Sequence, residues 1–154
     1  MAETSCQYDF TGIARLKLFW ALSRTPHGLL DMCTAAVASL LWLGHFPSFK
    51  IIGLGLITVF AGYTAVYALN DVVGYRSDKK KVQQGNLRGI EDCDDLDAIL
   101  VRYPMARGFL SFKEGLVWAV AWALLALIGA YLLNPICVLI FVGGCILETV
   151  YCLM

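Results

Sequence analysis

Long stretches without a charged side chain constrain this 154-residue chain more than any other feature. Residues 115–147 contain no Asp, Glu, Lys or Arg, and these 33 residues are too many for one helix across a bilayer. Asn134 and Pro135 lie near the middle of this stretch, and proline after asparagine is typical of a turn. Residues 51–70 are also uncharged and are long enough to cross a bilayer once. The chain is therefore expected to cross a membrane several times.

The fold class follows from these stretches. We predict an all-α integral membrane protein with four transmembrane helices, forming a single membrane domain over residues 1–154. Residues 10–24 carry Ile13, Leu16, Phe19 and Trp20 among basic residues, which favours an amphipathic helix at the membrane interface before the first span. The composition agrees, because 59% of the residues are hydrophobic and only 16% are charged, against about a quarter in soluble domains. The expected spans cover about residues 26–43, 51–70, 115–133 and 136–153, and residues 79–108 form a hydrophilic loop.

The basic residues predict the orientation of the spans. Eight of them lie between the second and third spans, three precede the first span, and Lys50 alone lies between the first and second. Under the positive-inside rule, the 79–108 loop and both termini are cytoplasmic, in the cytoplasmic membrane. The net charge of zero gives no reason to expect nucleic-acid binding. The six cysteines include no CxxC pair, so neither a disulfide framework nor a zinc site is expected.

The segment from Asn70 to Asp78 is the strongest candidate for a functional site. Asp71 and Asp78 lie about 20° apart on a helix, two turns along one face, with Asn70 and Gly74 beside them. Carboxylates where a membrane helix meets water are costly unless they face a cavity, a partner or a metal. Mg²⁺ prefers oxygen ligands and is commonly held by one or two carboxylates together with substrate phosphates. The spacing suits a metal–diphosphate site, and it is equally compatible with a polar helix end that the lipid headgroups solvate.

This segment, the basic loop and residues 104–111 together resemble the UbiA superfamily of intramembrane prenyltransferases. Members of that superfamily are all-helical enzymes that transfer an isoprenyl chain from its diphosphate to an aromatic or other lipid-soluble acceptor. Their first aspartate-rich motif, Asn-Asp-x-x-Asp-x-x-x-Asp, is matched by Asn70, Asp71 and Asp78, and Gly74 stands where the motif has its middle aspartate.

Two further segments carry the resemblance. The family element Arg-Pro-x-x-x-Gly is matched by Pro104 and Gly108, while Tyr103 occupies the arginine position and Arg102 precedes it. Residues 24–27, Arg-Thr-Pro-His, are similar to the Arg-Pro-His that opens the first span in the family, with one residue inserted. The matches follow one another in order over nearly the whole chain.

The resemblance implies a function and a set of site residues. Mg²⁺ is the expected cofactor, with Asn70, Asp71 and Asp78 as its ligands and the two aspartates as the catalytic residues. The expected partners are an isoprenyl diphosphate, a lipophilic acceptor and membrane lipid, in isoprenoid biosynthesis. A diphosphate also needs positive charge and hydrogen-bond donors beside its metals. The expected substrate-binding residues are therefore Asn70, Arg24, His27, Arg76, Arg102 and Arg107.

The family also implies that the site is shared with further helices. Its members have about nine spans and carry a second aspartate-rich motif in their later half. Residues 1–154 then correspond to the N-terminal half, either as a fragment or as one member of a split pair whose second chain carries the C-terminal helices. In isolation they are expected to be inactive. The alternative is a non-catalytic four-span subunit that binds lipid or assists assembly and keeps a degenerate diphosphate site.

Four other features have their own alternatives. Residues 79–81, all lysine, either bind phosphate or fix the topology at anionic lipid. Asp31 lies four residues after His27, so the pair either lines the acceptor end of a cavity or forms a structural hydrogen bond. Glu148 is either a functional acid or an interfacial one. The acidic run at residues 91–97 lacks the ligand spacing of a calcium loop and is expected to be solvated.

Overall fold

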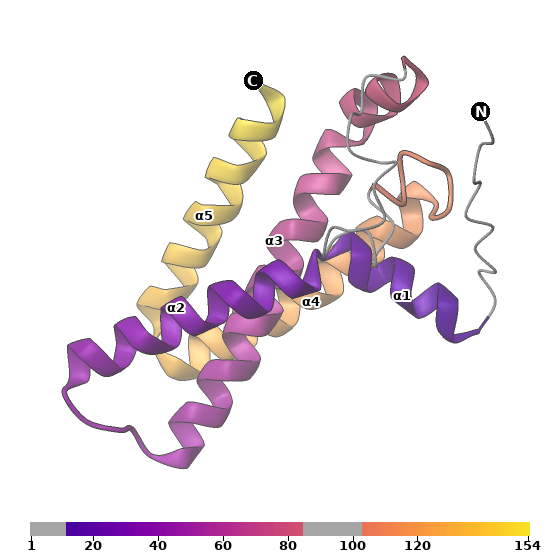
Figure 1. Ribbon diagram of the computed structural model, residues 1–154. Helices are drawn as coiled ribbons and strands as arrows, with labels where there is room; N and C mark the ends of the chain where they lie inside the picture. Colours follow the sequence, from indigo (N-terminus) through magenta and orange to yellow (C-terminus); the bar gives the residue numbers. More distant parts are fainter. Residues whose placement is uncertain (1–11, 85–102) are drawn as a thin grey trace.

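The computed structural model describes residues 12–84 and 103–154, which form five helices and no strand (Figure 1). The helices are α1 (Ile13–Leu22), α2 (Thr25–Leu43), α3 (Phe49–Gln83), α4 (Phe112–Leu133) and α5 (Pro135–Leu153). Four of them, α2 to α5, are long and apolar enough to cross a membrane. Over the described residues, the predicted all-α fold with four spans and a short preceding helix is confirmed.

Side-chain caps set the starts of the three later helices. Ser48 caps α3, and Ser111 caps α4 in a capping box with Glu114, in which each residue satisfies a backbone N–H of the other. Asn134 caps α5 with a side-chain oxygen that accepts from a backbone N–H at 2.9 Å. Pro135 occupies the first position of α5, where no N–H is needed. The long uncharged stretch is thus divided at Asn134 and Pro135, as the sequence predicts.

Two helix boundaries differ from the prediction. The sequence places residues 79–83 in the hydrophilic loop, whereas in the structure they form the last turns of α3. This segment contains no glycine or proline, and Lys80 and Lys81 lie in the last turn, where positive charge interacts favourably with the helix C-terminus. The helix predicted over residues 10–24 is shorter, because α1 begins at Ile13 and ends at Leu22. Since α3 continues past the uncharged stretch, the whole segment from Asn70 to Asp78 is helical.

α3 and α4 form the most extensive helix pair in the described part of the chain. Small residues allow the backbones of membrane helices to approach closely. At Gly129 of α4 an added Cβ would overlap the Oγ1 atom of Thr58 on α3, so glycine is required for this approach. Towards the other end of the pair, Ala68 of α3 and Ala119 of α4 are buried in one cluster. The two helices are therefore antiparallel, and we call the end that carries Asp71 and Asp78 the motif end.

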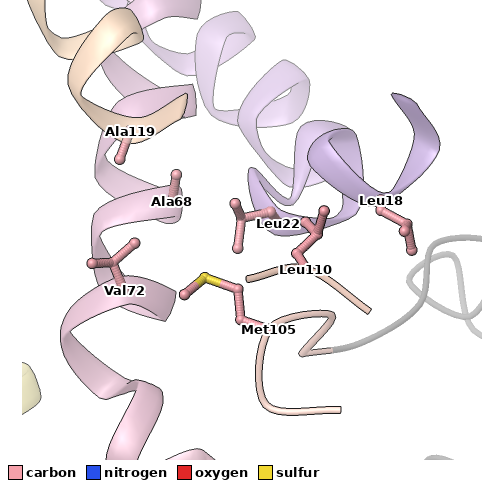
Figure 2. Packing of buried hydrophobic residues seen from close by; sticks show 7 residues of the cluster. All are labelled: Leu18, Leu22, Ala68, Val72, Met105, Leu110 and Ala119. Atoms are coloured by element: carbon pink, nitrogen blue, oxygen red, sulfur yellow. The ribbon is translucent and has the colours of Figure 1, made fainter. Parts of the chain in front are cut away.

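A cluster of buried apolar side chains lies at the motif end. Figure 2 shows Leu18 and Leu22 of α1, Ala68 and Val72 of α3, Met105 and Leu110 from the turns before α4, and Ala119 of α4. Met105 lies so close to α4 that a Cβ on Gly115 would overlap its Sδ atom. This cluster fixes α1 and residues 103–110 against the end of α3.

α1 packs through a different face from the one that the sequence indicates. The four apolar residues expected on one side do not form one buried face. Ile13, Leu16 and Trp20 are exposed, and only Phe19 packs inward, with its ring centroid 4.9 Å from that of Trp118. The helix is apolar on more than one side, so it can contact the bundle and still present apolar side chains outward. That exposed face is compatible with a position at the membrane interface. The buried residues of α1 are Leu18, Ala21 and Leu22.

α2 and α5 present apolar side chains outward over most of their length. α5 has no buried residue, and on α2 only Thr25 and Gly28 are buried. Trp42, near the end of α2, is 90% exposed. These faces suit contact with lipid chains or with further apolar helices.

Candidate functional site

One face of α3 carries a row of polar residues at the motif end. Tyr67, Asp71, Gly74 and Asp78 recur every three or four residues, so they lie along one side of the helix. Asp71 and Asp78 are buried, with 5% and 9% of their surface exposed. We call Asp71, Gly74 and Asp78 the aspartate stripe. Buried carboxylates need charged or hydrogen-bonding partners, because their desolvation is otherwise uncompensated.

Arg24 is the partner of Asp71. Its Nη2 atom donates to Asp71 Oδ1 at 3.4 Å. Arg24 lies between α1 and α2 with φ 44° and ψ 45°, a left-handed conformation that is uncommon for residues other than glycine. This conformation makes a sharp turn between the two helices and brings the guanidinium to α3. Because it costs on the order of 1 kcal/mol, the surrounding contacts must maintain it.

Two tyrosine rings flank the Arg24 guanidinium. Its Cζ atom lies 5.9 Å from the ring centroid of Tyr67 on α3 and 5.9 Å from that of Tyr103. Tyr103 has φ 54°, so the two non-glycine residues with positive φ in the described ranges meet at this point. Strained backbone that is retained in one place is frequently part of a functional site. The two rings and Asp71 together hold the guanidinium at this end of α3.

Asp78 lies over Gly74. A Cβ added to Gly74 would be 3.2 Å from Asp78 Oδ2, which is tighter than most real contacts. Asp78 Oδ1 accepts a hydrogen bond from Lys81 Nζ at 3.2 Å. The absence of a side chain at Gly74 therefore leaves the space that the Asp78 carboxylate occupies. A carboxylate at position 74 would shift the Asp78 side chain by a few tenths of an ångström and would add negative charge beside it, which a bound cation would neutralise.

Asn70 connects the motif to α5. Its Nδ2 atom donates to Glu148 Oε1 at 2.5 Å, and Cys152 Sγ lies 3.8 Å from the same oxygen. Glu148 is half-buried and contacts the motif directly through Asn70. The Asn70 nitrogen is used in helix packing, and its carbonyl oxygen is the atom that remains able to bind a metal ion.

Asp31 of α2 is bonded across to α3. Its Oδ2 atom accepts from the Tyr67 hydroxyl at 2.6 Å. Tyr67 therefore contacts both Arg24 and Asp31 and joins the motif helix to α2. The sequence suggests a pair between His27 and Asp31, and the structure adds the bond to Tyr67 as the contact that ties Asp31 to the motif helix.

Three of the other predicted substrate-binding residues lie on α3, on α2 and in the turns before α4. Arg76 is exposed on α3, and His27 is exposed on α2. Arg107 is half-buried in the turns before α4, where its backbone N–H donates to Tyr103 O at 3.1 Å. Arg102 and the acidic run at residues 91–97 lie outside the described residues. The structure thus brings Arg24 into contact with the stripe and leaves Arg76 as a peripheral candidate.

Comparison with protein families identifies the relatives of this chain. The model of the UbiA prenyltransferase family matches residues 32–154. The chain belongs to the UbiA prenyltransferase family. No significant match was found among curated proteins or among solved structures. Family membership and four apolar helices make this an integral membrane protein with an intramembrane prenyltransferase kind of function.

The matched range divides the site. The aspartate stripe, Tyr67, the turns before α4 and Glu148 all lie within the UbiA match. Two residues that contact α3 precede that range: Arg24, in the turn before α2, and Asp31, within α2. The contacts of these two residues are therefore features of this chain that the family match does not cover.

UbiA enzymes generally use a divalent metal ion. The oxygen ligands of the aspartate stripe are compatible with an ion that also binds the phosphate oxygens of the substrate. Asp71 and Asp78 are seven residues apart on one helix, so their Cα atoms are about 10 Å apart along its axis, and each carboxylate can hold an ion of its own. No three His, Cys, Asp or Glu side chains converge on a metal position within residues 12–84 and 103–154. Mg²⁺ commonly uses one or two carboxylates and completes its coordination with phosphate oxygens and water. Each aspartate of the stripe can supply such a ligand.

Sequence reasoning missed Tyr67 and did not connect Glu148 with Asn70. Tyr67 lies one turn before Asp71 on the same face, so the helical spacing contained the signal. Glu148 is separated from Asn70 by 78 residues, and no local pattern indicates that contact. Tyr103 is visible in the sequence only as a departure from the family element.

Proposed function

We propose that the aspartate stripe binds an isoprenyl diphosphate together with Mg²⁺, in an enzyme that transfers the isoprenyl group to a lipophilic acceptor within the membrane. One observation carries this proposal: Arg24 and Asp71 are in contact at the end of an apolar bundle. A carboxylate that suits Mg²⁺ and a guanidinium that suits phosphate are thereby placed side by side.

The residues of the chain have separate roles in this proposal. Asp71, Asp78 and the carbonyl oxygen of Asn70 would hold the metal ions, which supply neutralisation of the charge that develops on the departing diphosphate. Arg24 binds phosphate oxygens through its planar, permanently charged guanidinium. Tyr67 keeps the guanidinium near the diphosphate. The surrounding apolar helices exclude water, which would otherwise capture an allylic carbocation.

Further helices complete the site in this proposal. Support comes from α5, which buries no residue against the rest of the described chain and offers an apolar face for helices that would bring opposing carboxylates. These helices belong either to the same polypeptide or to a second chain. Residues 1–154 alone then bind an isoprenyl diphosphate weakly and do not turn it over. The proposed orientation has both ends of this segment on the cytoplasmic side of the cytoplasmic membrane.

The test measures binding of geranylgeranyl diphosphate to residues 1–154 in lipid nanodiscs, with Mg²⁺ and with a chelator. Asp71→Asn should weaken Mg²⁺-dependent binding about tenfold or more, since a charged ligand of the ion is lost. Asp94→Asn removes the same charge from the acidic run and serves as the matched control. Equal losses in the two variants would show that only bulk charge is sensed. Formation of a prenylated product by residues 1–154 alone would contradict the need for further helices.

A second candidate function is that of a non-catalytic four-span subunit. It is favoured by the ion pairs within the chain, because Arg24 neutralises Asp71 and Lys81 neutralises Asp78 without a metal. Gly74, in place of a family aspartate, reduces the negative charge further. Under this function, binding of the diphosphate is independent of Mg²⁺, so the chelator arm of the same experiment separates the two candidates.

A further inference from the structure

A cavity of about 330 Å³ lies between α1 and α4. None of the residues that line it belongs to the aspartate stripe. It is lined by one residue of α1 and five residues of α4: Phe19, Lys113, Glu114, Val117, Trp118 and Ala121. We call this cavity the α1–α4 cleft. Its volume falls within the range of sites that bind small molecules.

The α1–α4 cleft crosses the level at which α4 enters the membrane. Lys113 and Glu114 are the last charged residues before the uncharged stretch of residues 115–147. Val117 and Ala121 follow Lys113 at intervals of four residues, so the three lie in one row along the helix. Ala121 is about 12 Å from Lys113 along the helix axis. A ligand that fills the cleft therefore needs a polar head and an apolar chain.

The wall of the cleft is aromatic and is held in place by its own contacts. The ring centroids of Phe19 and Trp118 are 4.9 Å apart, and the Trp122 ring packs edge-on against Trp118 at 5.6 Å. The indole Nε1 of Trp118 donates to Ser23 Oγ at 2.8 Å, so the polar atom of this ring already has a partner. Val117, on the open side, is 69% exposed. The cleft thus offers an ordered apolar surface along which an acyl chain can lie.

The charged end of the cleft has an excess of one positive charge. The Glu114 carboxylate accepts from the Ser111 hydroxyl at 2.7 Å and is paired with Arg15, which compensates its charge. Lys113 is exposed and takes part in none of the ion pairs among residues 12–84 and 103–154. A phosphate diester carries one negative charge, and its oxygens accept charge-assisted hydrogen bonds from an ammonium group. The head that complements this end is therefore a singly charged anion.

We propose that the α1–α4 cleft binds an anionic phospholipid of the membrane. The phosphate lies against the Lys113 ammonium, and one acyl chain lies along Val117 and Ala121. The lipid contacts Phe19 and α4 together, so it also joins α1 to the bundle. This site goes beyond the proposed function and uses none of the residues assigned to the isoprenyl diphosphate.

Two other amphiphiles fit the charged end less well. A phosphatidylcholine head brings a fixed positive charge close to Lys113, and this repulsion offsets part of the gain from the phosphate. An isoprenyl diphosphate carries more negative charge than one ammonium group neutralises, and the Glu114 carboxylate lies beside it. The cleft therefore favours an anionic phosphate diester over both.

The experiment measures the quenching of Trp118 fluorescence by brominated phospholipids. Residues 1–154 with Trp20→Phe, Trp42→Phe and Trp122→Phe retain Trp118 as the only tryptophan. This chain is placed in nanodiscs of phosphatidylcholine that contain increasing fractions of either phosphatidylglycerol or phosphatidylcholine with brominated acyl chains. The phosphatidylglycerol should bind beside Trp118 about fivefold more tightly than the phosphatidylcholine.

Matched variants separate the head from the chain. Lys113→Gln should remove the preference for phosphatidylglycerol, whereas Lys80→Gln removes an exposed charge outside the cleft and should keep it. Ala121→Leu should lower the preference, because its side chain fills the space of the acyl chain. Ala38→Leu is its control, since Ala38 is also exposed and does not line the cleft.

Three results would overturn the proposal. The first is equal quenching of Trp118 by the two brominated lipids, and the second is an unchanged preference in Lys113→Gln. The third is recovery of the quenched fluorescence on addition of geranylgeranyl diphosphate, which would assign the cleft to the isoprenyl donor.

A chain that retains only Trp42 controls for surface charge. Trp42 is 90% exposed near the end of α2 and should show no preference between the lipids. The same preference at Trp42 would mean that phosphatidylglycerol is enriched around the whole chain, and this too would contradict a site in the cleft. The proposed function fails separately, if Asp71→Asn leaves Mg²⁺-dependent binding of the diphosphate unchanged.

Discussion

Replacing Arg24 tests how far the site depends on its ion pair with Asp71. Arg24→Met retains an apolar stem of similar length and leaves Asp71, which is 5% exposed, without its cation. Removing one partner of a buried ion pair costs about 3–5 kcal/mol. The Arg24 side chain is 36% exposed and the N–O distance is 3.4 Å, so the expected loss is smaller, about 2 kcal/mol.

The pair is isolated by a double-mutant cycle with Asp71→Asn. The double variant removes both charges, so it should be more stable than Arg24→Met alone, with a coupling energy of about 1–2 kcal/mol. Unfolding in mixed micelles of increasing denaturing detergent, followed by tryptophan fluorescence, gives the required free energies. Arg15→Met is the control, because the pair of Arg15 with Glu114 is more exposed and its loss should matter much less. If the losses of unfolding free energy in Arg24→Met and Asp71→Asn add up to the loss in the double variant, the coupling energy is zero and the claim that these side chains interact is refuted.

Three further predictions address the stripe, the helix interface and the topology. Gly74→Asp adds a carboxylate beside Asp78 and should raise Mg²⁺ affinity about three- to tenfold in an equilibrium binding assay, and a loss of affinity would argue against the stripe as the metal site. Gly129→Val forces a side chain into Thr58 and should lower the free energy of unfolding by about 2–3 kcal/mol, and an unchanged value would mean that α3 and α4 do not pack through this glycine. Lys80→Cys in a cysteine-free background should react with an impermeant thiol reagent only from the cytoplasmic side, and reaction from outside would reverse the proposed orientation.

The spans could be predicted because their signals are local. The absence of charge over residues 115–147 and the turn at Asn134 and Pro135 fix two helices without knowledge of their neighbours. The face of α1 could not be predicted in the same way. The helix is apolar on several sides, so its sequence does not show which side is buried. Leu18 and Leu22 are the buried residues because they pack in one cluster with Met105.

The candidate site shows the same division. Asp71 and Asp78 are recognisable from their spacing, and Arg24 is a candidate from the family resemblance alone. Their contact spans 47 residues and depends on the left-handed conformation of Arg24, which nothing in the local sequence requires. The bond between Asn70 and Glu148 likewise depends on how α5 packs on α3. Both pairs depend on how the helices pack against one another, and the sequence pattern of a single helix cannot predict such packing.

The reciprocal coupling of metal and diphosphate tests the central claim most directly. With Mn²⁺ in place of Mg²⁺, nanodiscs carrying residues 1–154 are titrated with geranylgeranyl diphosphate, and free Mn²⁺ is measured by electron paramagnetic resonance. Thermodynamic linkage requires that each ligand raise the affinity for the other by the same factor. The account predicts a factor of about ten or more in the wild-type chain and in Asp94→Asn, and no coupling in the double variant Asp71→Asn/Asp78→Asn. Unchanged coupling in that double variant would contradict the assignment of the aspartate stripe as the metal–diphosphate site.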